Sequence, residues 1–366
     1  MNQRIVVKIG SSSLTSEQGG LDRSKIAFFA NELLSIIANG HQIVLVTSGA
    51  VAAGFTRIGY STRPKQLHEK QAAAAVGQAL LMQAYQEQFN SQGVTAAQIL
   101  LTRQDFANRK RGHNAWMTIE ELIKQGVIPI VNENDTVSVD ELKFGDNDTL
   151  SALVANLVHA NQLVIITDTD GLYTADPRKD SNAKKFEHIE MITEEIYSYA
   201  GGAGSTVGTG GMRSKLDAAK IAMRGGVKAF VGSVQQDGDL RRAVEGVGTG
   251  TYFATKQNGL PVKKQWLGFH STPLGTIVVD GGAEQALLGK GSSLLPVGVH
   301  LVQGDFHAGD VVEVTGIDGK VIGRGIVNYE HDQLMQVAGC TTADVLKKLN
   351  VPRIEVIHRD EWVTLR

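Results

Sequence analysis

A glycine-rich stretch that ends in a lysine is the strongest sign of chemistry in this sequence. Residues 201–222 read GGAGSTVGTGGMRSKLDAAKIA, and Leu216 and Ala219 follow Lys215 at helical spacing. Glycines let backbone N–H groups approach an anion, and a helix N-terminus adds unpaired donors and a positive dipole. The pattern therefore predicts a phosphate-binding loop. It is not a Walker loop, because Ser214 rather than glycine precedes the lysine.

A lysine inside an apolar strand is the second sign. Residues 4–9 read RIVVKI and lead to Gly10 and three serines, which predicts a buried strand that delivers a loop. The ammonium group of Lys8 must then be paired or face a site, unless the strand lies at an edge of the sheet and the lysine points to water. Two lysines and glycine-rich N–H clusters suit phosphoryl transfer, which needs positioning and positive charge rather than a nucleophilic side chain.

Two polar loops supply carboxylates and amides together, NEND at 132–135 and GDND at 145–148. They could ligate Mg²⁺ directly, or they could recognise an amine and anchor a pair of lysines. We favour the second interpretation, because nucleotide enzymes usually bring Mg²⁺ with the phosphates. Asp148 could also cap a helix that begins near Thr149. The ten histidines have no metal-ligand spacing, so no protein-built metal site is predicted.

Alternating strands and helices must position these loops. The sequence predicts strands at 4–9, 43–46, 97–101, 127–131, 163–166 and 227–231, separated by helices at 22–39, 69–91 and 108–125 and by one that starts near 215. This alternation predicts an α/β fold, with a mostly parallel sheet covered by helices on both faces as a three-layer αβα sandwich. The polar turns then lie beyond the carboxyl ends of the strands, where such sheets bind ligands.

The pattern changes after residue 256. We expect a first domain at 1–256, a linker at 257–272 and a small β-rich domain at 273–366. The small domain should contain strands at 276–279, 311–314, 321–326 and 354–358 and a short helix at 283–290. It carries 8 basic and 12 acidic side chains, so it is acidic overall.

Composition narrows the class of protein. The 366 residues are 42% hydrophobic and 20% charged with a net charge of -2, which fits a globular protein and gives no sign of nucleic-acid or membrane binding. The single Cys340 cannot form an internal disulfide, which indicates a reducing compartment. No apolar run is long enough to span a membrane, and no signal-peptide pattern is present. We therefore expect a cytoplasmic protein.

Several blocks, in this order, resemble the glutamate 5-kinases of the amino acid kinase family. In the first domain they are VVKIGSS at 6–12, TSGA at 47–50, NEND at 132–135, GDND at 145–148, TD at 167–168, GLYTADPR at 171–178 and GTGGMRSK at 208–215. In the second domain, TIVVDGGA at 276–283, GSSLLPVG at 291–298 and GDVV at 309–312 resemble a PUA domain. The resemblance covers nearly the whole chain.

The resemblance implies the amino acid kinase fold and ATP-dependent phosphorylation of the side-chain carboxylate of L-glutamate to L-glutamyl 5-phosphate, the first step of proline biosynthesis. Lys8 and Lys215 would stabilise the transferring phosphoryl group, and Asp148 would hold both lysines in place. Glutamate would be bound by Ser48, Asp135 and Asn147. The nucleotide, with its Mg²⁺, would be bound by Lys8, Thr167, Asp168, Thr209, Gly210, Gly211, Met212, Arg213, Ser214 and Lys215.

Two alternatives remain open at this point. The chain could be another kinase of the same fold, acting on acetylglutamate, aspartate, carbamate or uridylate, although the second domain and the loop at 132–135 argue against this. It could also be an RNA-binding protein, because PUA domains usually bind RNA, although the acidic second domain disfavours phosphate neutralisation. The resemblance further implies a homo-oligomer, a dimer or tetramer, and a hand-off of product to glutamyl phosphate reductase.

Overall fold

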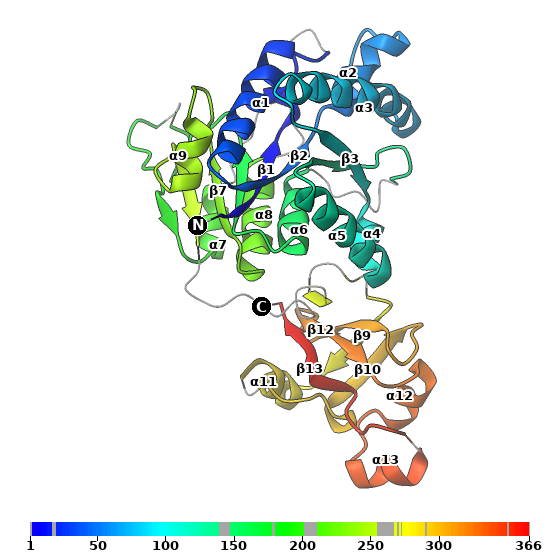
Figure 1. The fold of residues 1–366 in the computed structure, drawn as a ribbon. Helices are drawn as coiled ribbons and strands as arrows, with labels where there is room; N and C mark the ends of the chain where they lie inside the picture. Colours follow the sequence, from blue (N-terminus) through cyan, green and yellow to red (C-terminus); the bar gives the residue numbers. More distant parts are fainter. Residues whose placement is uncertain are drawn as a thin grey trace. The chain divides into compact units, whose positions relative to one another are not determined.

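The computed structural model describes residues 2–16, 20–138, 147–177, 180–200, 211–254, 267–268, 271, 273–289, 291–349 and 351–365. The chain forms two compact units, Met1–Asp105 with Arg109–Gly259, and Phe106–Asn108 with Leu260–Arg366 (Figure 1). Most of the linker predicted at 257–272 lies outside the described residues, so the domain boundaries stay a prediction.

The described strands of the first unit form an eight-stranded sheet in the order β3-β4-β2-β1-β5-β7-β8-β6. All neighbouring strands in it are parallel except β7 and β8. The strands are β1 (Arg4–Ile9), β2 (Gln42–Thr47), β3 (Ala96–Leu101), β4 (Ile128–Glu133), β5 (Gln162–Ile166), β6 (His188–Ile189), β7 (Lys228–Gly232) and β8 (Gly250–Phe253). This confirms the predicted α/β class with a mostly parallel sheet.

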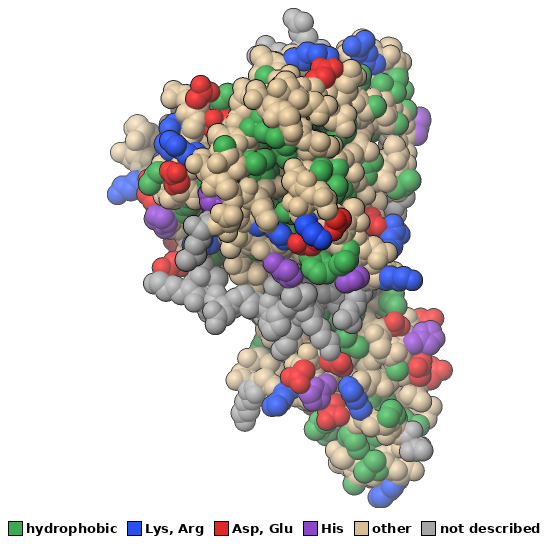
Figure 2. All heavy atoms as spheres, in the orientation of Figure 1, with side chains coloured by type: hydrophobic (Ala, Val, Ile, Leu, Met, Phe, Trp, Pro, Cys, Tyr) green, Lys and Arg blue, Asp and Glu red, His purple; other side chains and the backbone are tan. Residues whose placement is uncertain are grey.

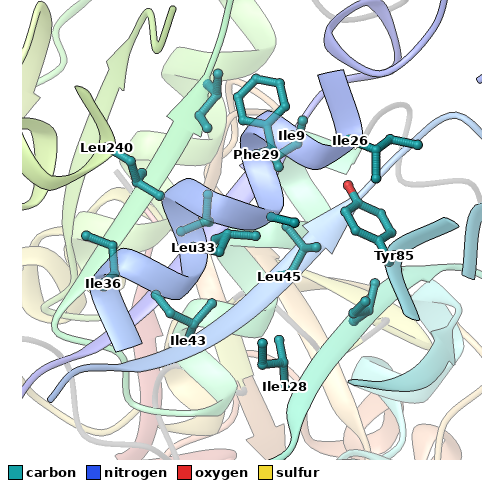
Figure 3. Close-up of a cluster of buried hydrophobic side chains, with 14 of the residues drawn as sticks. Ile9, Ile26, Phe29, Leu33, Ile36, Ile43, Leu45, Tyr85, Ile128 and Leu240 are labelled. Carbon is teal, nitrogen blue, oxygen red and sulfur yellow. The ribbon is translucent and has the colours of Figure 1, made fainter. Parts of the chain in front are cut away.

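Helices cover both faces of this sheet (Figure 1). They are α1 (Arg23–Ala38), α2 (Ala50–Gly54), α3 (Leu67–Asn90), α4 (Arg103–Ala107), α5 (Arg109–Lys124), α6 (Asn147–Leu157), α7 (Glu194–Tyr199), α8 (Met212–Arg224) and α9 (Asp239–Glu245), with 3-10 turns at Ser11–Ser13 and Phe55–Ile58. Helices α1, α3 and α9 share one core with strand residues such as Ile9 and Leu45 (Figure 3). Val7 belongs to the same core. Helices α5, α6 and α8 contact the sheet on its other face.

Local sequence explains how these helices begin and pack. The Asp22 side chain accepts hydrogen bonds from Ser24 N and Lys25 N at the start of α1, as an N-cap should. Helix α1 then buries Ile26, Leu33 and Ile36 at helical spacing, and each such side chain contributes about 1.5–3 kcal/mol.

Two glycines bring α2 and α3 into backbone contact. A Cβ atom added at Gly54 would lie 2.0 Å from Ala73 O, and one added at Gly77 would lie 1.8 Å from Ala50 O. Only glycine permits this approach, and it fixes α2 directly after the turn that ends β2.

The described strands of the second unit form a five-stranded sheet in the order β10-β9-β11-β12-β13. They are β9 (Gly275–Val279), β10 (Val299–Gly304), β11 (Val311–Thr315), β12 (Val321–Val327) and β13 (Ile357–Thr364), accompanied by α11 (Gly281–Gly289), α12 (His331–Val337), α13 (Thr342–Lys348) and a 3-10 turn at Pro296–Gly298. The unit has its own core, which includes Phe306, Tyr329 and Trp362.

Some predicted elements need correction. The helix predicted at 108–125 is α5, which spans Arg109–Lys124, and the short helix α4 that precedes it was not predicted. Helix α8 begins at Met212, earlier than the predicted start near 215, because Gly211 in an extended conformation provides the N-cap. The strand predicted at 354–358 is instead β13, which starts at Ile357. Ile357 pairs with Val327 of β12, and after a shift in register residues 362–364 pair with residues 323–325.

Two properties of the described residues bear on partners. Within the residues that the structure places, no helix combines the length and apolar composition that a membrane crossing needs. On the face drawn in Figure 2, basic and acidic side chains are interspersed, and no broad basic stripe is visible there.

Candidate active site

The polar residues that the sequence singled out meet at the carboxyl ends of four neighbouring parallel strands. Lys8 lies near the end of β1, Thr47 ends β2, Asn132 lies near the end of β4, and Thr167 follows β5. Strand β1 is central, with β2 on one side and β5 on the other. The alternative in which Lys8 sits on an edge strand and points to water is therefore excluded.

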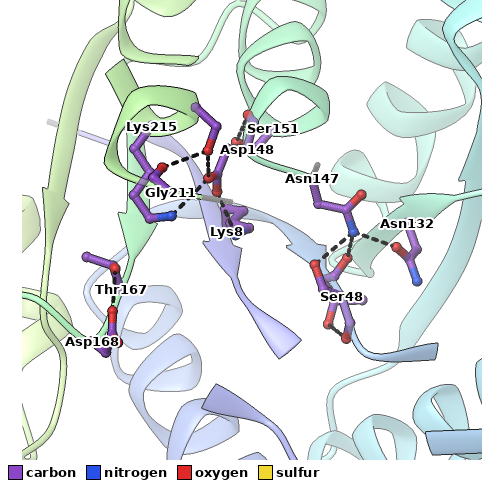
Figure 4. Close-up of polar contacts among 12 residues, drawn as sticks. Lys8, Ser48, Asn132, Asn147, Asp148, Ser151, Thr167, Asp168, Gly211 and Lys215 are labelled. Carbon is purple, nitrogen blue, oxygen red and sulfur yellow. Dashed lines mark hydrogen bonds and ion pairs between the residues drawn. The ribbon is translucent and has the colours of Figure 1, made fainter. Parts of the chain in front are cut away.

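A buried carboxylate bridges two lysines at this edge (Figure 4). Asp148 Oδ1 lies 2.6 Å from Lys8 Nζ, and Asp148 Oδ2 lies 3.1 Å from Lys215 Nζ. Side chains alternate along a strand, so Lys8 lies on the opposite face from Val7, toward α6 and α8, which carry Asp148 and Lys215. Sequence order separates these three residues widely, and the parallel sheet brings them together.

Burial and nearby charge shift the pKa of Asp148 in opposite directions. This residue is 0% exposed. Burial alone would raise the pKa of the Asp148 carboxyl, but the charges of Lys8 and Lys215 and their hydrogen bonds outweigh it and hold that pKa below its usual value. One carboxylate thus faces two ammonium groups, so these three side chains together carry a net positive charge.

The first turn of α8 contributes a further contact. Ser214 Oγ lies 3.0 Å from Asp148 Oδ2 and 2.9 Å from Gly211 O, and it can donate its single hydrogen to either oxygen. Helix α6 begins at Asn147, two residues before the predicted start near Thr149, so Asp148 lies in the first turn of α6 rather than at its N-cap. Its side chain binds the lysines and Ser214 instead of capping its own helix.

A second cluster is centred on Asn147, the residue directly before Asp148 (Figure 4). Asn147 Nδ2 donates to Thr47 O at 2.6 Å, to Ser48 Oγ at 2.9 Å and to Asn132 Oδ1 at 2.8 Å. This amide therefore ties the turn after β2 to the end of β4. Gly49, with a φ of 106°, makes the tight turn into α2 directly after Ser48.

The other predicted site residues that the structure describes lie after β4, after β5 and at the start of α8. Thr167 Oγ1 donates to Asp168 Oδ1 at 3.1 Å beyond β5 (Figure 4). Arg213 lies on the exposed side of α8, with its guanidinium 5.6 Å from the centre of the Tyr197 ring. Asp135 is half-buried in the segment after β4. Thr209 and Gly210 lie outside the described residues, so the contacts expected of them stay predictions.

Comparison with known proteins decides the family. The description "Amino acid kinase family" matches residues 3–233, and "PUA domain" matches residues 275–349. The chain belongs to the amino acid kinase family. It is 52% identical over 365 residues to "Glutamate 5-kinase" of Geobacillus thermodenitrificans and 50% identical over 365 residues to "Glutamate 5-kinase 1" of Bacillus subtilis.

These alignments span 100% of this chain and 98% and 99% of the two relatives, respectively. Among solved structures, a Giardia carbamate kinase covers 70% of this chain, and 99% of its own chain is covered, with a TM-score of 0.50 and 19% identity. This last likeness supports the fold alone.

Two features of this amino acid kinase were not predicted from its sequence. Ser151 Oγ donates to Asp148 O at 2.6 Å and so belongs to the same cluster. Gln78 of α3 accepts from Asn132 Nδ2 at 2.8 Å, which connects the helix to the strand ends. An Ala-rich helix gives no signal that one of its polar residues points inward, so only the three-dimensional packing shows it.

The donor chemistry of the site bears on metal binding. Both oxygens of Asp148 contact ammonium groups, which is not the environment of a carboxylate that ligates Mg²⁺. Among the residues that the structure describes, no group of three or more His, Cys, Asp or Glu side chains is arranged to hold a metal ion.

Proposed function

We propose that this chain transfers the terminal phosphoryl group of ATP to the side-chain carboxylate of L-glutamate and forms L-glutamyl 5-phosphate. The single observation that carries the proposal is the bridge from Asp148 to Lys8 and Lys215, placed one residue from the Asn147 cluster. The two lysines of the bridge suit a transferring phosphoryl group, and the Asn147 cluster suits a small polar acceptor. The shared name of the relatives, which match over the full chain, supports glutamate as that acceptor.

The reaction needs no nucleophilic residue and no base. An oxygen of the glutamate side-chain carboxylate, which is already ionised at neutral pH, forms the new bond to phosphorus. The bond to the bridging oxygen breaks, and ADP leaves with that electron pair. The transition state is loose, so the enzyme acts by holding donor and acceptor in line and by stabilising charge on the transferring group.

The lysines supply that charge. We propose that Lys8 and Lys215 contact the phosphoryl oxygens and the bridging oxygen, and that Asp148 holds both ammonium groups at the right separation while remaining ionised itself. The N-terminus of α8, with Gly211 and Met212 at its start, adds unpaired backbone N–H groups. The nucleotide enters as its Mg²⁺ complex, with Thr167, Asp168, Arg213 and Ser214 among the residues of its site.

Glutamate binds on the other side of Asp148. We propose that Ser48, Asp135 and Asn147 bind it, with Asp135 pairing with the α-ammonium group. The acyl phosphate product is labile, so we propose that glutamyl phosphate reductase takes it over directly in proline biosynthesis. We also propose a cytoplasmic homo-oligomer, a dimer or tetramer, as the resemblance implies.

A hydroxylamine trap tests the proposal. The protein is incubated with ATP, Mg²⁺, L-glutamate and hydroxylamine, and the γ-glutamyl hydroxamate formed from the acyl phosphate is measured. We expect hydroxamate only when all components are present, with far less from aspartate. Turnover only with aspartate, carbamate, acetylglutamate or uridine monophosphate would contradict glutamate as the acceptor and would assign the site to another member of the family.

A further inference from the structure

Two glutamines, Gln78 and Gln98, extend the hydrogen-bonded chain that begins at Asn147 and Asn132, and the reaction described above gives them no role. Asn147 Nδ2 donates to Asn132 Oδ1 at 2.8 Å, Asn132 Nδ2 donates to Gln78 Oε1 at 2.8 Å, and Gln78 Nε2 donates to Gln98 Oε1 at 2.9 Å. Asn132 is 2% exposed and Gln78 is 9% exposed. We call these four side chains, Asn147, Asn132, Gln78 and Gln98, the amide relay.

Two backbone groups fix the direction of the relay. Thr47 O can only accept, so the atom of the Asn147 amide that faces it must be the nitrogen. Glu133 N can only donate, and it donates to Asn132 Oδ1 at 2.8 Å, so the nitrogen of the Asn132 amide must face Gln78. The oxygen of Gln78 therefore points toward Asn132, and its nitrogen points toward Gln98.

This direction decides what Asn147 can offer to a ligand. Its nitrogen is already engaged by three protein acceptors, Thr47 O, Ser48 Oγ and Asn132 Oδ1, and its oxygen receives no hydrogen bond from the residues described. Figure 4 shows this oxygen on the side of the amide away from the three contacts. Asn147 thus presents an acceptor, and the only donor on glutamate at neutral pH is its α-ammonium group.

We propose that Gln78 is a positioning residue for the amino acid substrate. By accepting from the buried Asn132 amide, it keeps Asn132 and Asn147 turned so that the Asn147 oxygen meets the α-ammonium group of glutamate. Without that acceptor, the Asn132 nitrogen would be buried with no partner, and the relay would rearrange to relieve it. The proposal rests on the proposed function, because it takes glutamate as the ligand.

The relay offers a conservative variant that should rescue function. Gln78→Met keeps the length of the side chain but removes the acceptor for Asn132. Gln78→Glu keeps the acceptor, and the exposed Gln98 is free to turn its amide and donate to the second carboxylate oxygen. The matched control is Gln83→Met, the same substitution on the same helix, because Gln83 is exposed and its side chain donates a hydrogen bond to Glu87, away from the relay.

Kinetics on the full chain test the proposal, with hydroxamate formation as the measurement. For Gln78→Met we expect the KM for glutamate to rise at least fivefold, with kcat and the KM for ATP within twofold of the wild type, because the α-ammonium group lies away from the reacting carboxylate. For Gln78→Glu and Gln83→Met we expect all three constants within twofold. If Gln78→Met does not fold, Gln78→Ala replaces it. Alanine also removes the acceptor and favours a helix, so we expect the same changes in the kinetic constants.

Three results would overturn the inference. They are an unchanged glutamate KM in Gln78→Met, an equal rise in Gln78→Glu, and a fall in kcat without a rise in KM, which would place Asn147 at the reacting end of glutamate. If the wild type and Gln83→Met both fail to form hydroxamate from glutamate, the proposed function fails instead. An active wild type with an unaffected Gln78→Met contradicts the positioning role alone.

Discussion

The lysine of α8 gives the most direct test at the scale of single residues. Lys215→Ala removes one of the two ammonium groups that contact Asp148. We expect kcat to fall at least 100-fold, equivalent to about 3 kcal/mol of transition-state stabilisation, with a smaller effect on the KM values.

The matched control is Lys228→Ala, because Lys228 is exposed at the amino end of β7, the opposite edge of the sheet from the site. Its kcat should stay within twofold of the wild type. Turnover of Lys215→Ala within a few fold of the wild type would remove Lys215 from the phosphoryl-transfer step, and Lys8 would then be the only cation of the bridge left to test.

The lowered pKa of Asp148 makes a pH prediction. A carboxyl whose pKa is lower in the folded state stabilises the fold above its unfolded pKa, about 3.9, and loses that contribution as the pH falls through the folded pKa. Asp148→Asn leaves two buried ammonium groups without a counter-charge, so we expect about 3–5 kcal/mol of destabilisation at pH 7.

Urea unfolding at pH 7 and at a series of values below 4 measures this difference. The gap between wild type and Asp148→Asn should narrow as the pH falls, because Asp148 becomes neutral in the wild type too. Asp237→Asn, at an exposed position, is the control and should stay within about 0.5 kcal/mol of the wild type at pH 7. A gap that is independent of pH would contradict the ionised bridge.

The signal in the sequence was clearer for Lys8 than for Gln78. Lys8 was recognisable because a cation in an apolar strand demands a partner, and the structure supplies Asp148. Gln78 gave no such signal, since a glutamine on an Ala-rich helix is compatible with water or with burial. Its partner Asn132 lies 54 positions away, and only the packed fold shows that the two meet.

At the scale of elements, the crossing of α2 and α3 determines how the turn after β2 is held. Gly77→Ala would place a Cβ atom 1.8 Å from Ala50 O, so the two helices must move apart. We expect a loss of about 1–3 kcal/mol despite the better helix propensity of alanine, together with a raised KM for glutamate, because Ser48 immediately precedes α2.

Gly289→Ala is the control, because a Cβ atom at this helix end would have no heavy atom within 4 Å. Thermal unfolding and glutamate kinetics of both variants measure the difference. A Gly77→Ala protein as stable as the wild type would show that the helices adjust at no cost.

Element boundaries show where periodicity stops being informative. Six of the eight described strands in the first unit were predicted to within two residues, since buried parallel strands read as short apolar runs, whereas the short strands β6 and β8 were not predicted. Helix α4 was not predicted, because its five residues are too few to show a helical period. The start of α8 depended on the backbone conformation of Gly211, which composition does not reveal.

At the scale of the whole molecule, each unit buries its own apolar core, which predicts two separable unfolding events. Phe306 is 1% exposed in the core of the second unit. We expect Phe306→Ala to destabilise that unit by about 3–5 kcal/mol and to lower only one of two calorimetric transitions.

Leu346→Ala is the control, because Leu346 is 61% exposed on α13 of the same unit. Its transitions should stay close to those of the wild type. A single transition that shifts as a whole in Phe306→Ala would mean that the two cores unfold together. The two-domain organisation itself was expected from the change in pattern after residue 256, whereas the sheet order was not, because hydrophobic runs do not specify their neighbours.

The central position of β1 has a consequence for synthesis of the chain. The strand is made well before its neighbour β5 and before the counter-charge of Lys8 at Asp148. In a nascent chain that ends before α6, Lys8 has no Asp148 to pair with, and the edge of β1 that later pairs with β5 is open. An open edge of an apolar strand favours association with other unfolded chains. We therefore expect the first unit to complete its folding only after α8 has left the ribosome. Until then, β1 must be kept from pairing with other chains.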